Sequence, residues 1–214
     1  MNTDFELVRR ALAAPSPPPY VYPEAAGGEP AAVLALVREA PLSVVLHVRA
    51  ASLREHAGEL ALPGGRRDAG DASLLATALR ETREEFGIDP GDVEPVGELL
   101  AVPVITGKYS IHPFVGLTRA VPRAASPEIE RLVEMDLEPY LAGRAPVFYR
   151  LEPWRGSVVP TPFFRLPSGD VPYGATAAVI ADLLQRLSRA LGCALELRES
   201  RDRPWGDRYA REGG

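Results

Sequence analysis

The chain has 214 residues, of which 46% are apolar and 25% are charged, and its formal net charge is −5 at pH 7. This composition is that of an ordinary globular protein, which excludes a disordered chain and a collagen-like repeat. The apolar runs stay far below the roughly 18 to 20 residues that a membrane-spanning helix needs. A net acidic chain also argues against a general nucleic-acid-binding protein, since such domains usually carry a basic patch.

The cysteine count and the first residues point to a cellular compartment. A single cysteine, Cys193, excludes a disulfide framework and a multi-cysteine zinc site. The first six residues are acidic and lack the apolar core of a secretory signal. We therefore expect a cytoplasmic protein that binds neither membranes nor nucleic acid.

Hydrophobic periodicity predicts a mixture of helices and strands in the first half of the chain. In the longest predicted helix there, Leu75, Leu79, Thr82 and Phe86 share one face, and Gly87 follows as a C-terminal residue. The expected elements are, in chain order, a helix at 4–13, a proline- and glycine-rich linker at 14–30, strands at 31–38 and 42–49, a glycine turn at 63–65 and a helix at 71–86.

The second half predicts more strands and one long helix. The expected strands lie at 93–102, 110–118, 128–135 and 146–150, with at least one more within 158–172, and the helix at 174–191. The charged segment from residue 200 onwards is expected to be frayed. Six or more strands with two long helices predict an α/β sandwich in which a mixed sheet lies between helices. We divide the chain into an N-terminal helix and linker (1–30), one domain (31–199) and a charged C-terminal tail (200–214).

The helix expected at 71–86 carries three glutamates beside its apolar stripe. Glu81, Glu84 and Glu85 are spaced i, i+3 and i+4, so they lie within about a third of the helix circumference. Carboxylates this close repel one another at neutral pH, and a hard divalent cation such as Mg²⁺ relieves the repulsion. Arg80 precedes Glu84 by four residues and can pair with it. The alternative is a solvated charged helix face.

A glycine turn followed by basic residues leads into this helix. The run Leu62-Pro63-Gly64-Gly65-Arg66-Arg67-Asp68 combines glycines, which allow close backbone approach, with two arginines. A loop that feeds a helix N-terminus is well suited to an anion. The two features together predict a phosphate-binding turn leading into a metal-binding helix.

The residues of this helix resemble a known sequence motif. Arg80-Glu81-Thr82-Arg83-Glu84-Glu85-Phe86-Gly87-Ile88 is similar to the core of the Nudix box, which identifies Nudix hydrolases. Two positions depart from the usual box. Ala72 stands where a glutamate is usual, with Asp71 one residue further out, and Thr82 replaces a bulky apolar residue.

These departures are typical of the coenzyme A pyrophosphatase-like subfamily. Residues 46–65, from Leu46 to Pro63-Gly64-Gly65, resemble its upstream signature, residues 67–82 share its spacing, and Tyr173-Gly174-Ala175-Thr176-Ala177 resembles the start of a late helix. The resemblance spans about residues 42–190. Four residues differ from the subfamily pattern, namely Glu59 for glutamine, Ala61 for serine, Leu62 for phenylalanine and Tyr173 for tryptophan. Glu59 is acidic near the expected phosphate path, so it leaves the exact substrate open.

The resemblance implies a Nudix-type α/β/α sandwich and a hydrolytic activity. The expected substrate is a small nucleotide derivative, coenzyme A or an acyl-CoA, cut at its pyrophosphate to 3′,5′-ADP and (acyl-)4′-phosphopantetheine. The expected cofactor is Mg²⁺ or Mn²⁺, because bound cations neutralise a pyrophosphate and activate water. The implied site residues are the metal ligands Glu81, Glu84 and Glu85, the catalytic candidates Glu84, Glu85 and Glu128, and the substrate-binding candidates Arg49, Arg54, Gly64, Gly65, Arg66 and Arg67.

Several alternatives stay open at this stage. The enzyme can act on another nucleoside diphosphate derivative, such as a sugar nucleotide, a dinucleotide or a nucleoside triphosphate. A non-catalytic Nudix domain that senses a nucleotide is the rival outside enzymes. The general base, the preferred metal, the role of residues 1–30 and a homodimer are undecided. His56 is expected to satisfy backbone groups in its loop, and Trp154, Trp205 and Tyr109 are expected to pack in the fold rather than stack on adenine.

Overall fold

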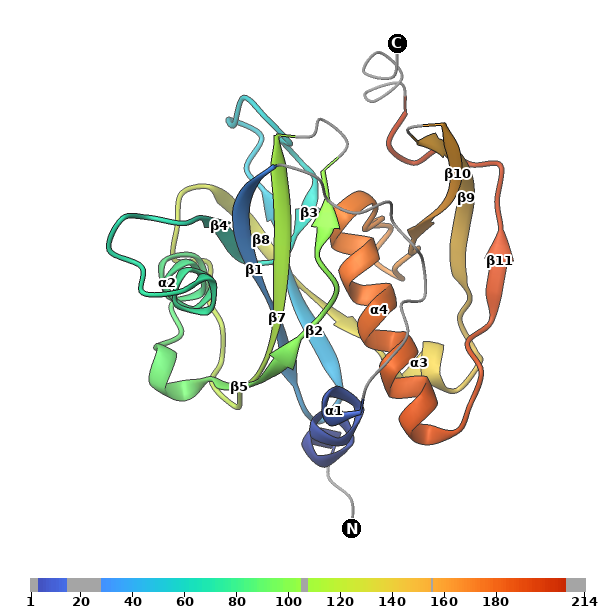
Figure 1. Cartoon of the computed structure of the whole chain (residues 1–214), viewed down its shortest axis with the longest axis horizontal. Helices are drawn as coiled ribbons and strands as arrows, with labels where there is room; N and C mark the ends of the chain where they lie inside the picture. The colour runs from blue at the N-terminus through green and yellow to red at the C-terminus, as the bar shows by residue number, and fades with distance from the viewer. Residues whose placement is uncertain (1–3, 15–27, 105–107, 155, 207–214) are drawn as a thin grey trace.

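The computed structural model describes residues 4–14, 28–104, 108–154 and 156–206. Four layers follow one another across the molecule (Figure 1). Helix α2 covers one face of a central sheet, α1 and α4 cover the other face, and a smaller sheet packs outside α4. The predicted α/β sandwich with a mixed sheet between helices is therefore confirmed. Most of the predicted linker at 14–30 lies outside the described residues.

The helices are few and the strands are many. The helices are α1 (Asp4–Ala13), α2 (Leu74–Phe86), the 3-10 turn η1 (Pro90–Asp92), α3 (Glu138–Leu141) and α4 (Gly174–Leu191). The strands are β1 (Glu29–Arg38), β2 (Ser43–Arg49), β3 (Leu60–Ala61), β4 (Gly64–Arg66), β5 (Glu94–Glu98), β6 (Val102–Pro103), β7 (Tyr109–Leu117), β8 (Ile129–Asp136), β9 (Val147–Trp154), β10 (Ser157–Phe163) and β11 (Leu197–Glu199).

The central sheet is mixed, with β1 in its interior. Its main path is β3-β2-β1-β7-β5, while β4 pairs with β1, β6 with β7 and β8 with β2. Strand β1 runs parallel to β7 and antiparallel to β2 and β4. Because β1 pairs on both edges and is covered on both faces, it is nearly all apolar, as buried strands usually are.

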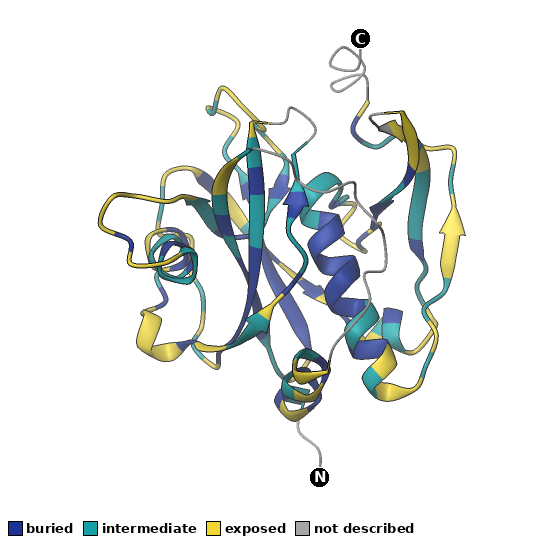
Figure 2. Ribbon diagram, in the orientation of Figure 1, coloured by how far each residue is buried: buried dark blue, intermediate teal, exposed yellow. Residues whose placement is uncertain are grey.

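The alternation of side chains along β1 builds a core on each face of the central sheet. Ala32, Leu34 and Leu36 belong to the core under α2. Ala35 and Val37 belong to the larger core, to which α1 and α4 contribute most of their apolar side chains. Figure 2 shows α4 mostly buried between the two sheets, apart from its exposed C-terminal end, whereas α2 keeps an exposed outer face.

The outer sheet has the order β10-β9-β11, and the segment after β11 packs against it. Trp205 is 5% exposed, and its ring lies 6.1 Å from that of Phe163 and 6.0 Å from that of Tyr173. The expectation that the chain frays from residue 200 is therefore wrong for residues 200–206. A large aromatic ring buried in this way holds a charged segment in place.

Several predicted element boundaries need correction. The helix expected from residue 71 begins at Leu74, because Ser73 caps it by accepting a hydrogen bond from the Ala76 amide. The strand expected at 93–102 is two strands, β5 and β6, and the pairing of β5 with β7 shifts register between Pro95 and Gly97. The expected glycine turn is itself strand-paired as β4, and β11 was not predicted.

None of the helices in the described part of the chain is long and apolar enough to cross a membrane.

Candidate active site

The glycine pair of β4 lies between β1 and α2, where a side chain at Gly64 would meet backbone and one at Gly65 would displace the Glu81 side chain. A Cβ atom on Gly64 would lie 2.3 Å from the Ala32 carbonyl oxygen. A Cβ atom on Gly65 would lie 2.4 Å from Oε1 of Glu81. Glycine therefore lets the backbone pair with β1 on one side and receive a carboxylate of α2 on the other.

Glu85 turns inward from α2 to the first of these glycines. Its residue is 7% exposed, and its Oε2 accepts a hydrogen bond of 3.0 Å from the Gly64 amide. Burial raises the pKa of Glu85 to about 7, with further rises from the charges of Glu81 and Glu128. The Gly64 amide and Arg49 act in the opposite direction. Glu85 thus exchanges its proton near neutral pH while holding a fixed position.

Glu81 lies one helical turn earlier on the same side of α2. Its side chain is 18% exposed, and its Oε1 lies 2.9 Å from Nη1 of Arg80. Burial raises the pKa of Glu81, although Arg80 partly offsets this effect. Glu81 and Glu85 therefore place two desolvated carboxylates against consecutive glycines of β4.

Arg80 links the helix to the loop before it. Its Nε and Nη2 each donate a 3.1 Å hydrogen bond to the Asp71 carboxylate, and Nη2 also donates to the Arg66 carbonyl. Asp71 accepts further hydrogen bonds from the Thr77 hydroxyl and the Asp68 amide. The Arg80 guanidinium, followed by these donors, holds the pKa of Asp71 well below its usual range. Asp71, which stands one residue away from the usual acidic position of the motif, therefore holds Arg80 in place.

Glu84 lies on the outer side of this group. Nη1 of Arg80 donates to both of its carboxylate oxygens at 3.3 Å, which confirms the predicted pair. The Glu84 side chain is 57% exposed, in contrast to Glu81 and Glu85. The helix thus directs two of its three glutamates inward and leaves the third at the surface.

The loop between β7 and β8 brings Glu128 toward Glu85. The amides of Arg123 and Ala125 donate to the carbonyls of Phe86 and Glu85 at the end of α2, where Gly87 adopts a left-handed conformation. The Glu128 carbonyl accepts from the Ala50 amide at 2.7 Å. Its exposed side chain is close enough for its charge to raise the pKa of Glu85.

Arg49 comes to the same region from the end of β2. Ile129 pairs opposite Arg49 in the sheet and belongs to the core under α2, so the Arg49 side chain points to the α2 face. Its buried Nε finds no hydrogen-bond partner among the described residues. Two residues earlier on this face, His47 is 1% exposed and packs edge-on against Phe86. Burial, with a smaller effect from Arg49, lowers the pKa of His47 to about 4, so it is neutral.

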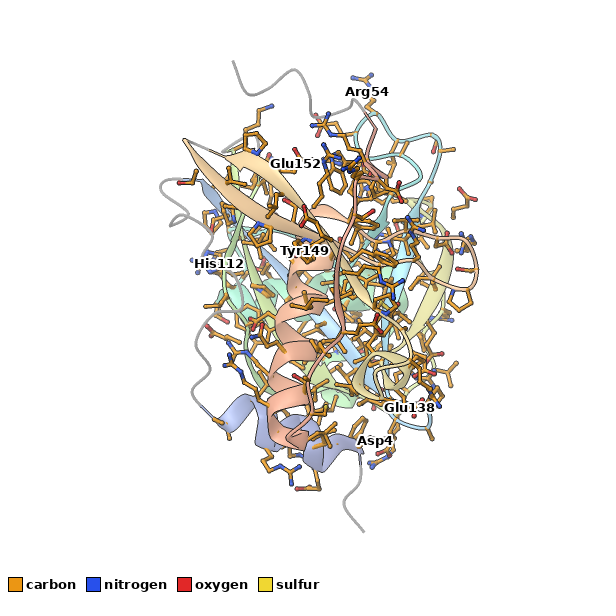
Figure 3. All side chains as sticks on the ribbon, turned by 90° about the vertical axis from the view of Figure 1, so that its right-hand side faces the viewer. Asp4, Arg54, His112, Glu138, Tyr149 and Glu152 are labelled. Carbon is orange, nitrogen blue, oxygen red and sulfur yellow. The ribbon has the colours of Figure 1, made fainter. Side chains whose placement is uncertain are left out.

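The other predicted arginines are more dispersed. Arg67 is exposed and donates to the carbonyls of Asp71 and Ala72. Arg66 is exposed on β4, opposite Ala31 of β1. Arg54 lies at the extremity of the molecule opposite to Asp4 and Glu138, in the view that shows the side chains (Figure 3). Of the predicted arginines, Arg49 is thus the one whose charge acts on the pKa of Glu85.

His56 and Glu59 form a pair that sequence reasoning missed. His56 was expected to satisfy backbone groups, but its Nδ1 lies 2.9 Å from Oε2 of Glu59. The three-residue spacing and opposite charge type were the available signal, although the left-handed backbone of His56 (φ 58°) could not be read from it. Among the aromatic candidates, Trp205 packs in the fold as predicted, while the Trp154 side chain lies outside the described residues.

The carboxylates of α2 are the type of ligand that a hard divalent cation prefers, although their oxygens do not surround a single position. In the ranges that the structure describes, no three histidine, cysteine, aspartate or glutamate side chains form a group that could hold a metal ion. Glu85 and the partly buried Glu81 nevertheless offer carboxylate oxygens, which Mg²⁺ prefers, at the Gly64–Gly65 pair. A cation there would stabilise the ionised carboxylates and so oppose the desolvation that raises both pKa values.

A family model gives the decisive comparison. The NUDIX domain model matches residues 28–150, which include the glycine pair, α2 and the loop that carries Glu128. The chain belongs to the Nudix family.

Curated relatives carry the same family name, and a solved structure shares the fold. A Nudix hydrolase of Citrobacter koseri named NudL, itself uncharacterised, is 41% identical over 112 residues, covering 50% of this chain and 56% of that protein. The NudL protein of Salmonella paratyphi B is 42% identical over 109 residues. The chain thus spans about half the length of these curated relatives. A Nudix hydrolase structure from Alicyclobacillus acidocaldarius covers 76% of this Nudix chain and 92% of its own, with 17% identity and a TM-score of 0.50.

Proposed function

We propose that this Nudix protein is a metal-dependent pyrophosphohydrolase that cleaves coenzyme A or an acyl-CoA. The main supporting observation is that the buried carboxylate of Glu85 and the partly buried carboxylate of Glu81 lie against Gly64 and Gly65. The family match supports the hydrolase class, and the resemblance of residues 46–65 to the coenzyme A signature supports the substrate. One water is consumed, the P–O–P bridge breaks, and the products are 3′,5′-ADP and 4′-phosphopantetheine or its acyl form.

On the α2 face of the sheet, we assign the glutamates to the cation and the glycines and arginines to the diphosphate. Glu81 and Glu85, with the more exposed Glu84 at the rim, would hold Mg²⁺ or Mn²⁺. The cation, when bound, neutralises the diphosphate and lowers the pKa of a coordinated water. Gly64 and Gly65 let the diphosphate approach the backbone, and Arg49 supplies a partly desolvated positive charge beside Glu85. Arg66, Arg67 and Arg54 surround this region as further phosphate-binding candidates.

A general base must accept a proton from water near neutral pH. Glu85 has a pKa of about 7, because of burial and two neighbouring carboxylates. Glu128 is the second candidate, since its loop is held against the end of α2 by backbone hydrogen bonds. Glu84 is the third, although its pairing with Arg80 favours a role at the rim. The ionised form of Glu85 is stabilised by the positive charge of Arg49.

The test is a turnover assay followed by mass spectrometry. Coenzyme A, acetyl-CoA, ADP-ribose, a diadenosine polyphosphate and deoxynucleoside triphosphates are each incubated with Mg²⁺ or Mn²⁺. We expect coenzyme A to yield 3′,5′-ADP and phosphopantetheine faster than the others react. Glu85→Gln should lower turnover about tenfold or more, because it removes a buried anionic oxygen while retaining an acceptor for the Gly64 amide. Glu130→Gln, at an exposed position of β8, is the matched control.

A second substrate class has one observation in its favour. Glu59 stands where the coenzyme A signature has glutamine, so the chain can act on another nucleoside diphosphate derivative. Cleavage of a sugar nucleotide or dinucleotide with coenzyme A left intact would establish this class. Nucleotide binding without any metal-dependent turnover would instead support a sensor domain.

A further inference from the structure

Glu59 lies on the same face of the central sheet as the candidate active site. The register of β2 and β3 pairs His47 with Ala61 and Val48 with Leu60, so Arg49 comes next opposite Glu59. The Arg49 amide donates to the Glu59 carbonyl at 2.9 Å, which extends the pairing of the two segments by one residue. Directly opposed residues of antiparallel strands project to one face. Glu59 therefore lies beside Arg49 on the face toward α2 and Glu85.

The Glu59 carboxylate is nearly buried, whereas its histidine partner reaches solvent. The Glu59 side chain is 14% exposed and that of His56 is 49% exposed, with 2.9 Å between Oε2 and Nδ1. Two backbone hydrogen bonds close the loop of residues 50–58. The Gly58 amide donates to the Arg49 carbonyl at 2.9 Å, and the Glu59 amide donates to the His56 carbonyl at 3.1 Å. The loop geometry thus fixes the distance between the two charged groups.

Three charged residues act on His56 together with burial, namely Glu59, Arg49 and Glu55. Glu59, immediately before β3, and Glu55 of the same loop favour its protonated form, while burial and Arg49 of β2 oppose it. The hydrogen bond to Glu59 is the largest of these effects and raises the pKa of His56 above its usual value. Below that pKa the pair is a neutral ion pair, and above it the Glu59 charge is no longer balanced by His56. Arg49 acts on both His56 and Glu85, so it connects the two groups electrostatically.

We propose that His56 neutralises Glu59 beside the diphosphate site, so that loss of the His56 proton weakens binding of an anionic substrate. This inference rests on the proposed function, since it takes the Gly64–Gly65 region as the place where a diphosphate binds. Glu59 and His56 are specificity-determining residues rather than catalytic ones. Their pair explains how a carboxylate at a glutamine position of the signature remains compatible with a polyanionic substrate.

The test is a double-mutant cycle with His56→Asn, Glu59→Gln and the double variant. Asparagine suits the left-handed backbone of residue 56, and glutamine keeps the shape of Glu59. The probe is methylenediphosphonate with Mn²⁺, measured by calorimetry at pH 6.0 and pH 8.5. Its own ionisation cancels when variants are compared at one pH. Thermal unfolding of all four proteins shows that each variant is folded.

Binding by the wild-type protein should weaken about three- to fivefold more between these pH values than binding by Glu59→Gln. His56→Asn should bind weakly at both pH values, and the double variant should recover the affinity of Glu59→Gln. The KM for coenzyme A should follow the same order, with kcat changed less. Equal affinities of His56→Asn and the wild-type protein at pH 6.0 would overturn the proposal, as would an unchanged pH dependence in Glu59→Gln.

A substrate-independent measurement separates this proposal from the proposed function. The chain has three histidines, so ¹³C NMR of the imidazole carbons resolves His56 by comparison with His56→Asn. The pKa of His56 should fall in Glu59→Gln. If the pKa falls and diphosphonate binding follows the cycle while coenzyme A is not cleaved, the pair stands and the substrate assignment fails. If the pKa of His56 does not change, the pair itself is refuted.

Discussion

Helices α2 and α4 cover opposite faces of the same central sheet, yet they differ in what they bury. Helix α4 lies between two sheets and buries mostly apolar side chains, among them Ile180, Leu183 and Leu184. Helix α2 is covered on one side only, and its buried residues include Glu85. The carboxylate that α4 does bury, Asp182, is held by Arg186 of the same helix and by the Leu100 amide, as a buried charge must be. A helix at the edge of the core can instead hold carboxylates half in and half out of solvent. The candidate metal-ligating glutamates therefore lie on α2, the less covered of the two helices.

The largest effect that this comparison predicts is on stability, and it concerns α4. Leu183 is fully buried, and we expect Leu183→Ala to lower the free energy of unfolding by about 3 kcal/mol through lost contacts and a cavity. Turnover per folded molecule should stay unchanged, because α4 supplies no group to the candidate site. Urea unfolding measures the change. Leu191→Ala, at an exposed position of the same helix, is the matched control, and an equal loss there would contradict the contrast.

The next effect is a pH dependence that α2 introduces. Burial raises the pKa of Glu85 to about 7, so the metal-free folded protein retains a proton that the unfolded chain releases above about pH 4.5. The free energy of unfolding should therefore fall as pH rises from about 4.5 to 7, by about 2 kcal/mol relative to Glu85→Gln. Urea unfolding in the presence of a chelator compares the two proteins at each pH. Parallel curves would show that Glu85 ionises normally.

The smallest of the three effects sharpens the role of the glycine pair. In Gly65→Ala the new methyl group would meet Oε1 of Glu81, and this flexible side chain can move away with little loss of stability. We expect Mn²⁺ affinity to fall about tenfold, about 1.4 kcal/mol, because one of the two carboxylates at the glycine pair is displaced. Calorimetry measures the affinity. Gly70→Ala, where a Cβ atom meets nothing within 4 Å, is the control. Equal affinities in the two variants would remove Glu81 from the proposed metal site.

Local sequence patterns predicted α2 and α4 well for a physical reason. Their apolar residues recur at helical spacing, Gly87 and Gly192 end them in left-handed conformations, and these signals lie within a few residues of one another. The start of α2 was predicted three residues early, at residue 71. The sequence pattern did not show that Ser73 is the N-cap and that residues 71–73 precede the helix. The pairing of Arg80 with Glu84 was predictable for the same local reason, since both lie on one helix.

The candidate site depended on contacts between distant segments. The sequence by itself determined the composition of the site, namely the glycine pair, the three glutamates of α2 and the arginines near them. Only the tertiary structure decided that Glu85 meets the Gly64 amide, that Asp71 anchors Arg80 and that Glu59 takes His56 as partner beside Arg49. It also decided which glutamates are buried, because desolvation depends on what the sheet and the β7–β8 loop place around a side chain, and no spacing along one helix contains that information.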